Sequence, residues 1–195
     1  MRLGVFGGTF DPPHLGHLLV AVDACERLGL DRLLLVPAAT QPLKAGRESA
    51  PVADRLAMTR LLAGADARFG IDDSEIERGG LSFTVDTLRA LRTREPTATL
   101  LLCVGADAFA RFADWREPDT IAQLATVAVL ARSGRQPDAA ALAAVRGAVT
   151  VSVRCVDISS TEIRARAAAG KSLRGFVTDP VAEYCGAHAL YRPRV

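Results

Sequence analysis

Apolar residues along this chain gather in short uninterrupted runs, and the runs alternate with segments in which apolar positions follow a helical spacing. The runs cover residues 2–6, 32–37, 99–104, 126–131 and 149–156. Such runs are typical of strands that are buried on both faces of a parallel sheet. Between the first two runs, one helical stripe is drawn by Leu18, Val22, Cys25 and Leu28. The pattern therefore predicts a strand, a helix and a second strand in succession.

Further elements are predicted in the segments between the later runs. Apolar residues at helical spacing follow Pro51 and Thr84. Proline suits the first turn of a helix, and threonine suits its cap. Residues 69–76 are expected to form one or two short strands, and residues 134–147 a surface helix rich in alanine. Strands and helices thus alternate along most of the chain.

Five or six strand–helix units in one run, without an internal repeat or a linker, predict an α/β fold. We expect a doubly wound parallel sheet with right-handed crossovers. Residues 1–195 are predicted to form a single domain. Within it, residues 1–169 would make the α/β core and residues 170–195 a small helical C-terminal tail.

Composition narrows the class of protein. The 195 residues are 49% hydrophobic, which is enough for one sizeable core. A net charge of +2, with both signs interspersed, argues against a dedicated nucleic-acid surface. The four cysteines have neither the spacing of a metal site nor that of a disulfide framework, and we expect them to be reduced core residues. They are Cys25, Cys103, Cys155 and Cys185.

The sequence shows no signal of export or of membrane insertion. Its first residues lead directly into a predicted strand, and no apolar run has the length of a membrane span. We therefore expect a cytoplasmic protein. Its oligomeric state, including a homo-oligomer, is left open.

The segment from Gly7 to His17 joins the first predicted strand to the first predicted helix. Two glycines let the backbone approach a ligand closely, and the helix that begins near Gly16 presents unpaired N–H groups and a positive dipole end. This arrangement favours phosphate binding. His14 and His17 add donors that can follow charge as it shifts between phosphate oxygens.

A second segment of this kind follows the last apolar run. Ser159 and Glu162 have the spacing of a capping box, so a well-capped helix is one sufficient explanation. Ser160 and Thr161 also offer hydroxyls to phosphate at that helix start, with Arg164 one turn further on.

Four other positions are compatible with either a structural or a ligand-binding role. By its local pattern Lys44 is a solvated loop lysine and Thr84 a helix cap, and only the family resemblance described next adds a ligand-binding role for each. Asp107 follows a strand end beside Gly105, a place suited to contact ribose or a phosphate that carries a metal. Trp115, the only tryptophan, covers the core edge or stacks on a flat ring.

Taken together, these segments resemble the nucleotidylyltransferase superfamily. The first turn matches every position of its signature G-G-x-F-D-P-x-H-x-G-H. Residues 158–164 resemble its I-S-[ST]-T-x-[IL]-R element, and residues 105–107 its G-x-D. The motifs occur in the family's order, at strand ends, over almost the whole chain.

Residues 78–88 are similar to the R-x-x-x-S-[YF]-T-x-x-T-L element of bacterial nicotinate-nucleotide adenylyltransferases. Trp115 and Arg132 match a tryptophan and an arginine of that family. The family's loop motif P-P-H-[KR] keeps its cation as Lys44, whereas Leu43 replaces its histidine. The resemblance implies transfer of an adenylyl group from ATP to nicotinate mononucleotide, with deamido-NAD and pyrophosphate as products.

The same resemblance implies roles for individual residues and for a metal ion. Mg²⁺ would arrive on the ATP phosphates, without a protein ligand set of its own. Charge stabilisation is assigned to His14, His17, Lys44 and Arg164. ATP binding is assigned to Gly7, Gly8, Thr9, Phe10, Gly105, Asp107, Arg132, Ile158, Ser159 and Ser160. Binding of nicotinate mononucleotide is assigned to Phe83, Thr84 and Trp115.

Two other functions stay open from the sequence. Another transferase of the superfamily, acting on phosphopantetheine or an alcohol phosphate, is disfavoured by the Phe83–Thr84 element and by Trp115. A non-catalytic nucleotide sensor or RNA-binding module is disfavoured by the intact histidines and by the weak net charge.

Overall fold

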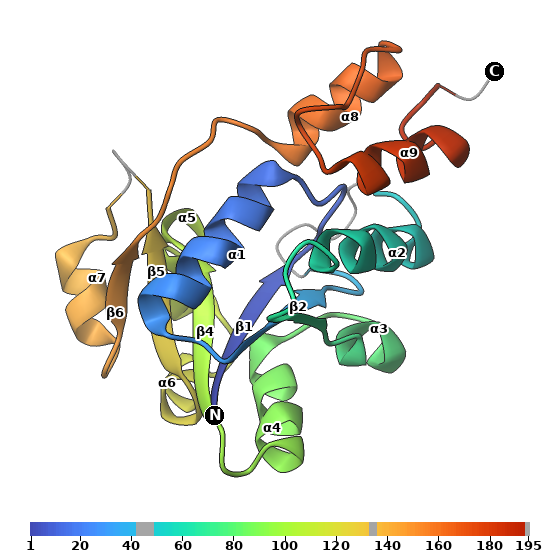
Figure 1. The fold of residues 1–195 in the computed structure, drawn as a ribbon. Coiled ribbons are helices and arrows are strands. Elements are labelled where there is room, and N and C mark those ends of the chain that lie inside the picture. Colours follow the sequence, from blue (N-terminus) through green and yellow to red (C-terminus); the bar gives the residue numbers. More distant parts are fainter. Residues whose placement is uncertain (42–48, 133–135, 194–195) are drawn as a thin grey trace.

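The computed structural model describes residues 1–41, 49–132 and 136–193. Within these ranges the chain forms a six-stranded sheet in the order β3-β2-β1-β4-β5-β6, and all neighbouring strands are parallel (Figure 1). The chain builds outward from β1 to β3, returns to the other side of β1, and builds outward again from β4 to β6. The sheet is therefore doubly wound, as predicted, and its strand order reverses between β1 and β4. The strands are β1 (Arg2–Gly8), β2 (Arg32–Pro37), β3 (Phe69–Ile71), β4 (Thr99–Gly105), β5 (Thr126–Ala131) and β6 (Val149–Ser152).

Helices connect the strands and follow the last one. None of the described helices is long and apolar enough to cross a membrane. They are α1 (Leu15–Leu28), α2 (Val52–Ala63), α3 (Ser74–Arg78), α4 (Thr84–Arg94), α5 (Ala106–Phe109), the 3-10 turn η2 (Phe112–Asp114), α6 (Pro118–Leu124), α7 (Ala139–Ala144), α8 (Ser160–Ala168) and α9 (Asp179–Ala187).

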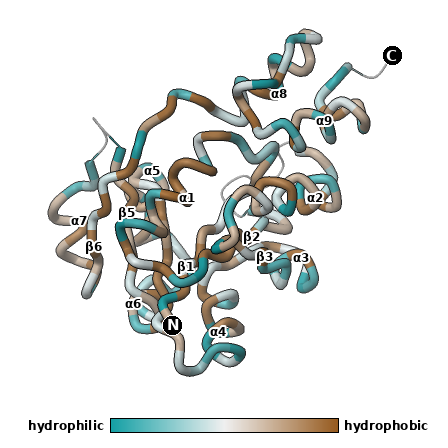
Figure 2. The backbone as a smooth tube through the Cα atoms, in the orientation of Figure 1, coloured by the Kyte–Doolittle hydropathy of each residue, from teal (hydrophilic) through white to brown (hydrophobic). Residues whose placement is uncertain are grey.

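The sheet is buried on both faces, because successive side chains of a strand point to opposite sides. In β2, Leu34 and Val36 pack with residues of α4 and α6, whereas Leu33 and Leu35 pack with residues of α1. Figure 2 shows the hydrophobic positions concentrated along the central strands. This two-sided burial explains why the strands appear in the sequence as continuous apolar runs.

The segment expected to form one or two short strands differs from that prediction. Residues 69–71 form β3, but residues 74–78 form helix α3. Asp72 causes the change, since its Oδ1 accepts a hydrogen bond from the Ser74 backbone N–H at 3.1 Å and turns the chain.

The last strand is also shorter than predicted and ends at Ser152 rather than at residue 156. Beyond it, the backbone N–H of Arg154 donates to Oδ2 of the buried Asp23 in α1 at 2.6 Å, which draws the chain away from the sheet. As a result Cys155 is exposed, and its prediction as a core residue is wrong. The other three cysteines are buried free thiols.

The C-terminal segment packs on α2, beside the carboxyl-end edge of the sheet (Figure 1). Met58 of α2 shares a buried cluster with Ile163 of α8 and with Val181 of α9. The Tyr184 hydroxyl of α9 donates to Oδ1 of Asp54 in α2 at 2.8 Å. The end of the chain is thereby brought close to the turn that follows β1.

Candidate active site

A pocket opens at the carboxyl ends of β1 and β4, where the strand order reverses. The residues assigned from the sequence that line it are Gly7, Gly8, Phe83, Thr84, Gly105 and Trp115. A Cβ added to Gly105 would meet no described atom within 4 Å, so the glycine leaves space for a ligand rather than for another part of the protein. The pocket thus joins the phosphate turn to the segment expected to hold the pyridine ring.

Two histidine side chains cap the first turn of α1. The His17 N–H donates to Nδ1 of His14 at 3.3 Å, and the His14 N–H donates to Nδ1 of His17 at 3.2 Å. The rings are stacked, with centroids 3.7 Å apart. Because an accepting Nδ1 carries no proton, the proton of each neutral ring lies on Nε2. The capping geometry therefore assigns the tautomer that can donate to a phosphate oxygen.

The neighbours of the two histidines fix their rings. A Cβ at Gly16 would lie 3.0 Å from Cε1 and Nδ1 of His14, so a larger residue there would displace the ring. Phe10 is only 2% exposed, and its ring centroid lies 5.1 Å from that of His17. The Phe10 ring therefore supports the turn by packing, and a contact with ATP is left to its backbone.

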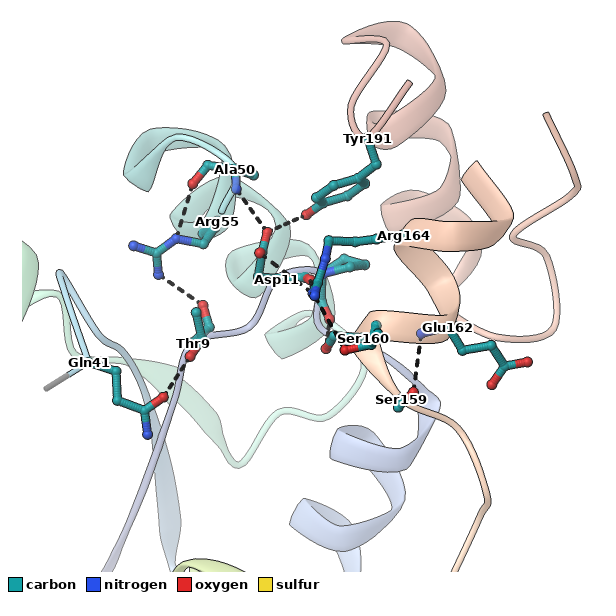
Figure 3. Close-up of polar contacts among 12 residues, drawn as sticks. Thr9, Asp11, Gln41, Ala50, Arg55, Ser159, Ser160, Glu162, Arg164 and Tyr191 are labelled. Atoms are coloured by element: carbon teal, nitrogen blue, oxygen red, sulfur yellow. Dashed lines mark hydrogen bonds and ion pairs between the residues drawn. The ribbon is translucent and has the colours of Figure 1, made fainter. Parts of the chain in front are cut away.

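Helix α8 meets the same turn, although it is far away in the sequence (Figure 3). The Ser160 hydroxyl donates to the Pro12 carbonyl at 3.0 Å, and Nη1 of Arg164 donates to the Asp11 carbonyl at 2.8 Å. Ser159 caps the helix by accepting from the Glu162 N–H at 3.2 Å, as predicted. The two phosphate-binding elements predicted from the sequence are thus in direct contact.

The start of α4 differs in detail from the prediction. Thr84 is the first residue of the helix and Phe83 occupies the cap position, so the prediction of Thr84 as a side-chain cap is wrong. Within the described residues, the Thr84 N–H has no acceptor, since the hydrogen bonds of this turn begin with the Asp86 N–H and the Phe83 carbonyl at 3.1 Å. The Ser82 hydroxyl, which accepts from the Ala39 N–H at 2.9 Å, ties this helix start to the end of β2.

The remaining assigned residues surround the site to different degrees. Asp107 is exposed in the first turn of α5, and Arg132 directly follows β5. The positive charge of Arg132 contributes to lowering the pKa of His14, which places it within electrostatic reach of the first turn. Lys44, like Leu43, lies outside the described residues.

Comparison with known proteins decides the family. A cytidylyltransferase-like family model matches residues 5–166. A probable nicotinate-nucleotide adenylyltransferase from Gemmatimonas aurantiaca is 47% identical over 197 aligned residues, which cover 98% of this chain and 93% of that one. The chain belongs to the nicotinate-nucleotide adenylyltransferase family. A second member, from Thermus thermophilus, is 44% identical and covers 98% of this chain and 100% of its own.

The fold is shared with a distant adenylyltransferase structure. Plasmodium falciparum nicotinic acid mononucleotide adenylyltransferase, solved in complex with NaAD, superposes with a TM-score of 0.81 at 17% identity. The superposition covers 97% of each chain. At this identity the likeness concerns the fold alone.

In this member of the adenylyltransferase family, Arg55 is a buried residue that joins several segments around the site, and it was not predicted from the sequence. Its side chain is 1% exposed and donates only to main-chain carbonyls among the described residues. Nη1 donates to Thr9 at 2.9 Å and to Ala38 at 2.7 Å, Nη2 to Ala39 at 2.9 Å, and Nε to Ala50 at 3.3 Å. Burial lowers the pKa of Arg55 below its usual value, and the nearby Asp11 charge opposes this. One guanidinium thus ties together the turn after β1, the end of β2 and the start of α2.

The sequence position of Arg55 departs from the usual pattern of an amphipathic helix, in which charged residues lie on the exposed face. The buried face of α2 consists of Arg55, Met58, Thr59, Leu62 and Ala63, whereas Ala53 is exposed and Leu56, Ala57 and Leu61 are half-buried. Arg55 thus stands on the buried face of α2, where an apolar residue is expected, and this departure is the sequence signal for its role.

Replacing Arg55 with leucine should destabilise the protein strongly, because four carbonyls lose their common donor in a buried place. The expected cost is about 3–5 kcal/mol, or roughly 10 °C in Tm for a domain of this size. Arg60→Leu is the matched control, since the Arg60 side chain on the same helix is 58% exposed and forms a surface ion pair with Asp73. Equal Tm values for the two variants by calorimetry would contradict this role of Arg55.

His14 is 6% exposed, and burial together with the Arg132 charge lowers its pKa from 6.5 to about 4. His14 is therefore neutral in the folded protein near neutral pH, in agreement with the accepting Nδ1. In the unfolded chain it takes up a proton as the pH falls through 6.5. The stability that a neutral His14 contributes is thus complete above pH 6.5 and is lost as the pH falls towards about 4.

The variant His14→Asn keeps a capping side chain but removes this titration. Between pH 7 and about pH 4.5, the parent should lose about 2.5 kcal/mol more unfolding free energy than the variant. Urea denaturation at both pH values measures the difference. Parallel losses in the two proteins would show that His14 is not held neutral by the fold.

Proposed function

We propose that this chain transfers the adenylyl group of ATP to the phosphate of nicotinate mononucleotide, giving deamido-NAD and pyrophosphate. The observation that carries the proposal is the pocket lined both by Gly7 and Gly8 of the phosphate turn and by Phe83, Thr84 and Trp115. A nucleotide phosphate and a pyridine ring can therefore occupy one continuous site. The names of the relatives at 47% and 44% identity support the same activity.

The reaction is an attack of a mononucleotide phosphate oxygen on the α-phosphorus of ATP, and pyrophosphate leaves. Such phosphoryl chemistry needs alignment and charge stabilisation rather than a covalent intermediate on the protein. In this proposal the Nε2–H groups of His14 and His17, at the start of α1, donate to the α-phosphate as its charge redistributes. Both rings would act as neutral donors.

The leaving pyrophosphate is proposed to lie at the start of α8. Ser159 and Ser160 stand at that helix start, and Arg164 follows one turn later. The helix offers N–H groups and a positive dipole end, and a guanidinium offers two parallel donors to phosphate oxygens. Gly105, Asp107, Arg132 and Ile158 are proposed to complete ATP binding, and Lys44 to add a further cation.

Mg²⁺ is proposed to arrive on the ATP phosphates. No cluster of three or more His, Cys, Asp or Glu side chains suited to a metal occurs among the described residues. Mg²⁺ commonly keeps several waters and is bound through substrate phosphates. The ion would supply charge neutralisation on the triphosphate.

For the nicotinate end, we propose that the carboxylate accepts hydrogen bonds from the first N–H groups of α4. The Thr84 N–H, which has no acceptor in the described part of the chain, and the positive end of the helix favour a negative group. Trp115 would stack on the pyridine ring, and its ring already lies against Phe112 with centroids 5.3 Å apart. We place the reaction in the cytoplasm, where buried free thiols such as Cys25 and Cys103 stay reduced.

Purified protein with ATP and Mg²⁺ should release pyrophosphate on addition of nicotinate mononucleotide. Nicotinamide mononucleotide should react with a kcat/KM lower by about tenfold to a hundredfold, because charged hydrogen bonds are worth about 1.5–3 kcal/mol. Turnover with phosphopantetheine instead of either mononucleotide would overturn the proposed function. Equal kcat/KM for the two mononucleotides would overturn the preference.

Thr84→Pro should narrow this preference, because it deletes one N–H at the helix start. Proline is well tolerated at the first position of a helix, and the preceding Phe83 has an extended backbone (φ −110°, ψ 126°) that suits a following proline. Thr84→Ala is the control, since it removes the hydroxyl but keeps the N–H, and it should retain the parent's ratio. The ratio of kcat/KM values for the two mononucleotides is the measurement, and identical ratios in the two variants would exclude the Thr84 N–H as the cause.

A further inference from the structure

The carboxylate of Asp11 lies where four segments of the chain meet. It is 4% exposed and belongs to the turn after β1. Its Oδ1 accepts from the Ala50 N–H at 3.1 Å, just before α2, and from the Tyr191 hydroxyl at 2.8 Å. Its Oδ2 lies 3.7 Å from Nη1 of Arg164 in α8. Figure 3 shows Tyr191 and Arg164 pointing to Asp11 from the C-terminal segment and from α8.

Arg164 is held through the same residue in a second way. Its Nη1 donates to the main-chain carbonyl of Asp11 at 2.8 Å, and its Nη2 donates to the Thr161 hydroxyl oxygen at 3.3 Å. Asp11 therefore fixes one edge of the guanidinium with its carbonyl and its charge. A displacement of Asp11 moves Arg164 as well.

The backbone that carries Tyr191 adopts an unfavourable conformation. Tyr191 has a φ of 64° and Ala189 a φ of 49°, both in the left-handed region that non-glycine residues rarely adopt. Such residues cost on the order of 1–3 kcal/mol each and persist only where surrounding contacts hold them. Burial and the Asp11 charge raise the pKa of the Tyr191 phenol, so the hydroxyl stays protonated and donates. The strained end of the chain thus delivers one donor to one carboxylate oxygen.

We propose that Tyr191 is a positioning residue: its hydroxyl holds the Asp11 carboxylate so that Asp11 directs Arg164 towards the nucleotide phosphates. Without the hydroxyl, Oδ1 of the buried Asp11 keeps the Ala50 N–H as its one donor among the described residues. The carboxylate then gains most by turning to Arg164 and pairing with it, since a buried charge needs donors. That ion pair competes with phosphate for the same guanidinium. The role rests on the proposed function insofar as Arg164 meets the phosphates of ATP.

The chain offers a matched control for this proposal. The Tyr184 hydroxyl also donates to a carboxylate, Oδ1 of Asp54, at 2.8 Å, and it docks the same C-terminal segment on α2. Tyr184→Phe and Tyr191→Phe each delete one hydroxyl and one hydrogen bond to an acid. Only the second change affects the residue that holds Arg164.

The test measures the Kd for ATP with Mg²⁺ by titration calorimetry, together with kcat and KM for both substrates. Tyr191→Phe should weaken ATP binding and lower kcat/KM for ATP by about tenfold, the scale of one hydrogen bond to a charged group. KM for nicotinate mononucleotide should stay within about twofold, because Arg164 does not meet that substrate in the proposal. Tyr184→Phe should match the parent in all of these values, whatever its effect on Tm.

A double-mutant cycle separates positioning from simple loosening of the chain end. In the background of Arg164→Ala, Tyr191→Phe should have no further effect on the Kd for ATP. A persistent tenfold effect in that background, or equal ATP affinity in the two tyrosine variants, would overturn the positioning role. A parent that binds ATP but does not transfer an adenylyl group would refute the proposed function alone. A parent that does not bind ATP would refute both.

Discussion

The site depends on two buried charges, Asp11 and Arg55, that both bind the main chain of Ala50. Ala50 donates its N–H to the Asp11 carboxylate at 3.1 Å, and its carbonyl accepts from Arg55 at 3.3 Å. Arg55 also binds the Thr9 carbonyl at 2.9 Å, so the turn after β1 is tied to the start of α2 both through Asp11 and through Arg55. Removal of the Asp11 carboxylate would leave the Ala50 N–H and the Tyr191 hydroxyl without this acceptor, and removal of Arg55 would leave four carbonyls without this donor. The geometry of the phosphate turn is therefore set by charge satisfaction as much as by its glycines.

This arrangement separates the residues that hold the turn from those that face the ligand. Arg55 and Asp11 form their hydrogen bonds with the protein itself, whereas His14 and His17 cap the helix through Nδ1, which places the ring proton on Nε2. The capping box thus does two things at once: it satisfies two N–H groups at the start of α1 and fixes the histidine tautomers. A proton on Nδ1 of His14 would break that box. The low pKa of about 4 agrees with the need to keep it off.

Much of the fold could be predicted from the sequence, because a strand that is buried on both faces appears as a continuous apolar run. The turn after β1 and the start of α8 could be predicted from their glycine, proline and helix-capping residues. Local patterns failed where a single side chain redirects the chain, as Asp72 does before α3. They also failed at Arg55, because hydrophobic periodicity assigns a charged residue to the solvent side of a helix. The contact between Tyr191 and Asp11 joins residues 180 positions apart, and no local rule reports it. Lys44 and Leu43 lie outside the described residues, and the role assigned to Lys44 stays a prediction.

The fixed geometry of the phosphate turn lowers the stability of the folded protein. Phe10 has a φ of 50° in the turn itself, and Tyr191 has a φ of 64° at the chain end that holds it. The buried charges of Arg55 and Asp11 add a desolvation cost, which favourable packing and hydrogen bonding elsewhere in the fold must offset. These free-energy costs arise when the protein folds and not when a nucleotide binds. Hydrogen-bond donors that are already in place stabilise developing charge most effectively, because they need no rearrangement during the reaction. The C-terminal segment therefore contributes to the site through a contact at Asp11: Tyr191 donates to the Asp11 carboxylate, which also accepts the Ala50 N–H and lies 3.7 Å from Arg164.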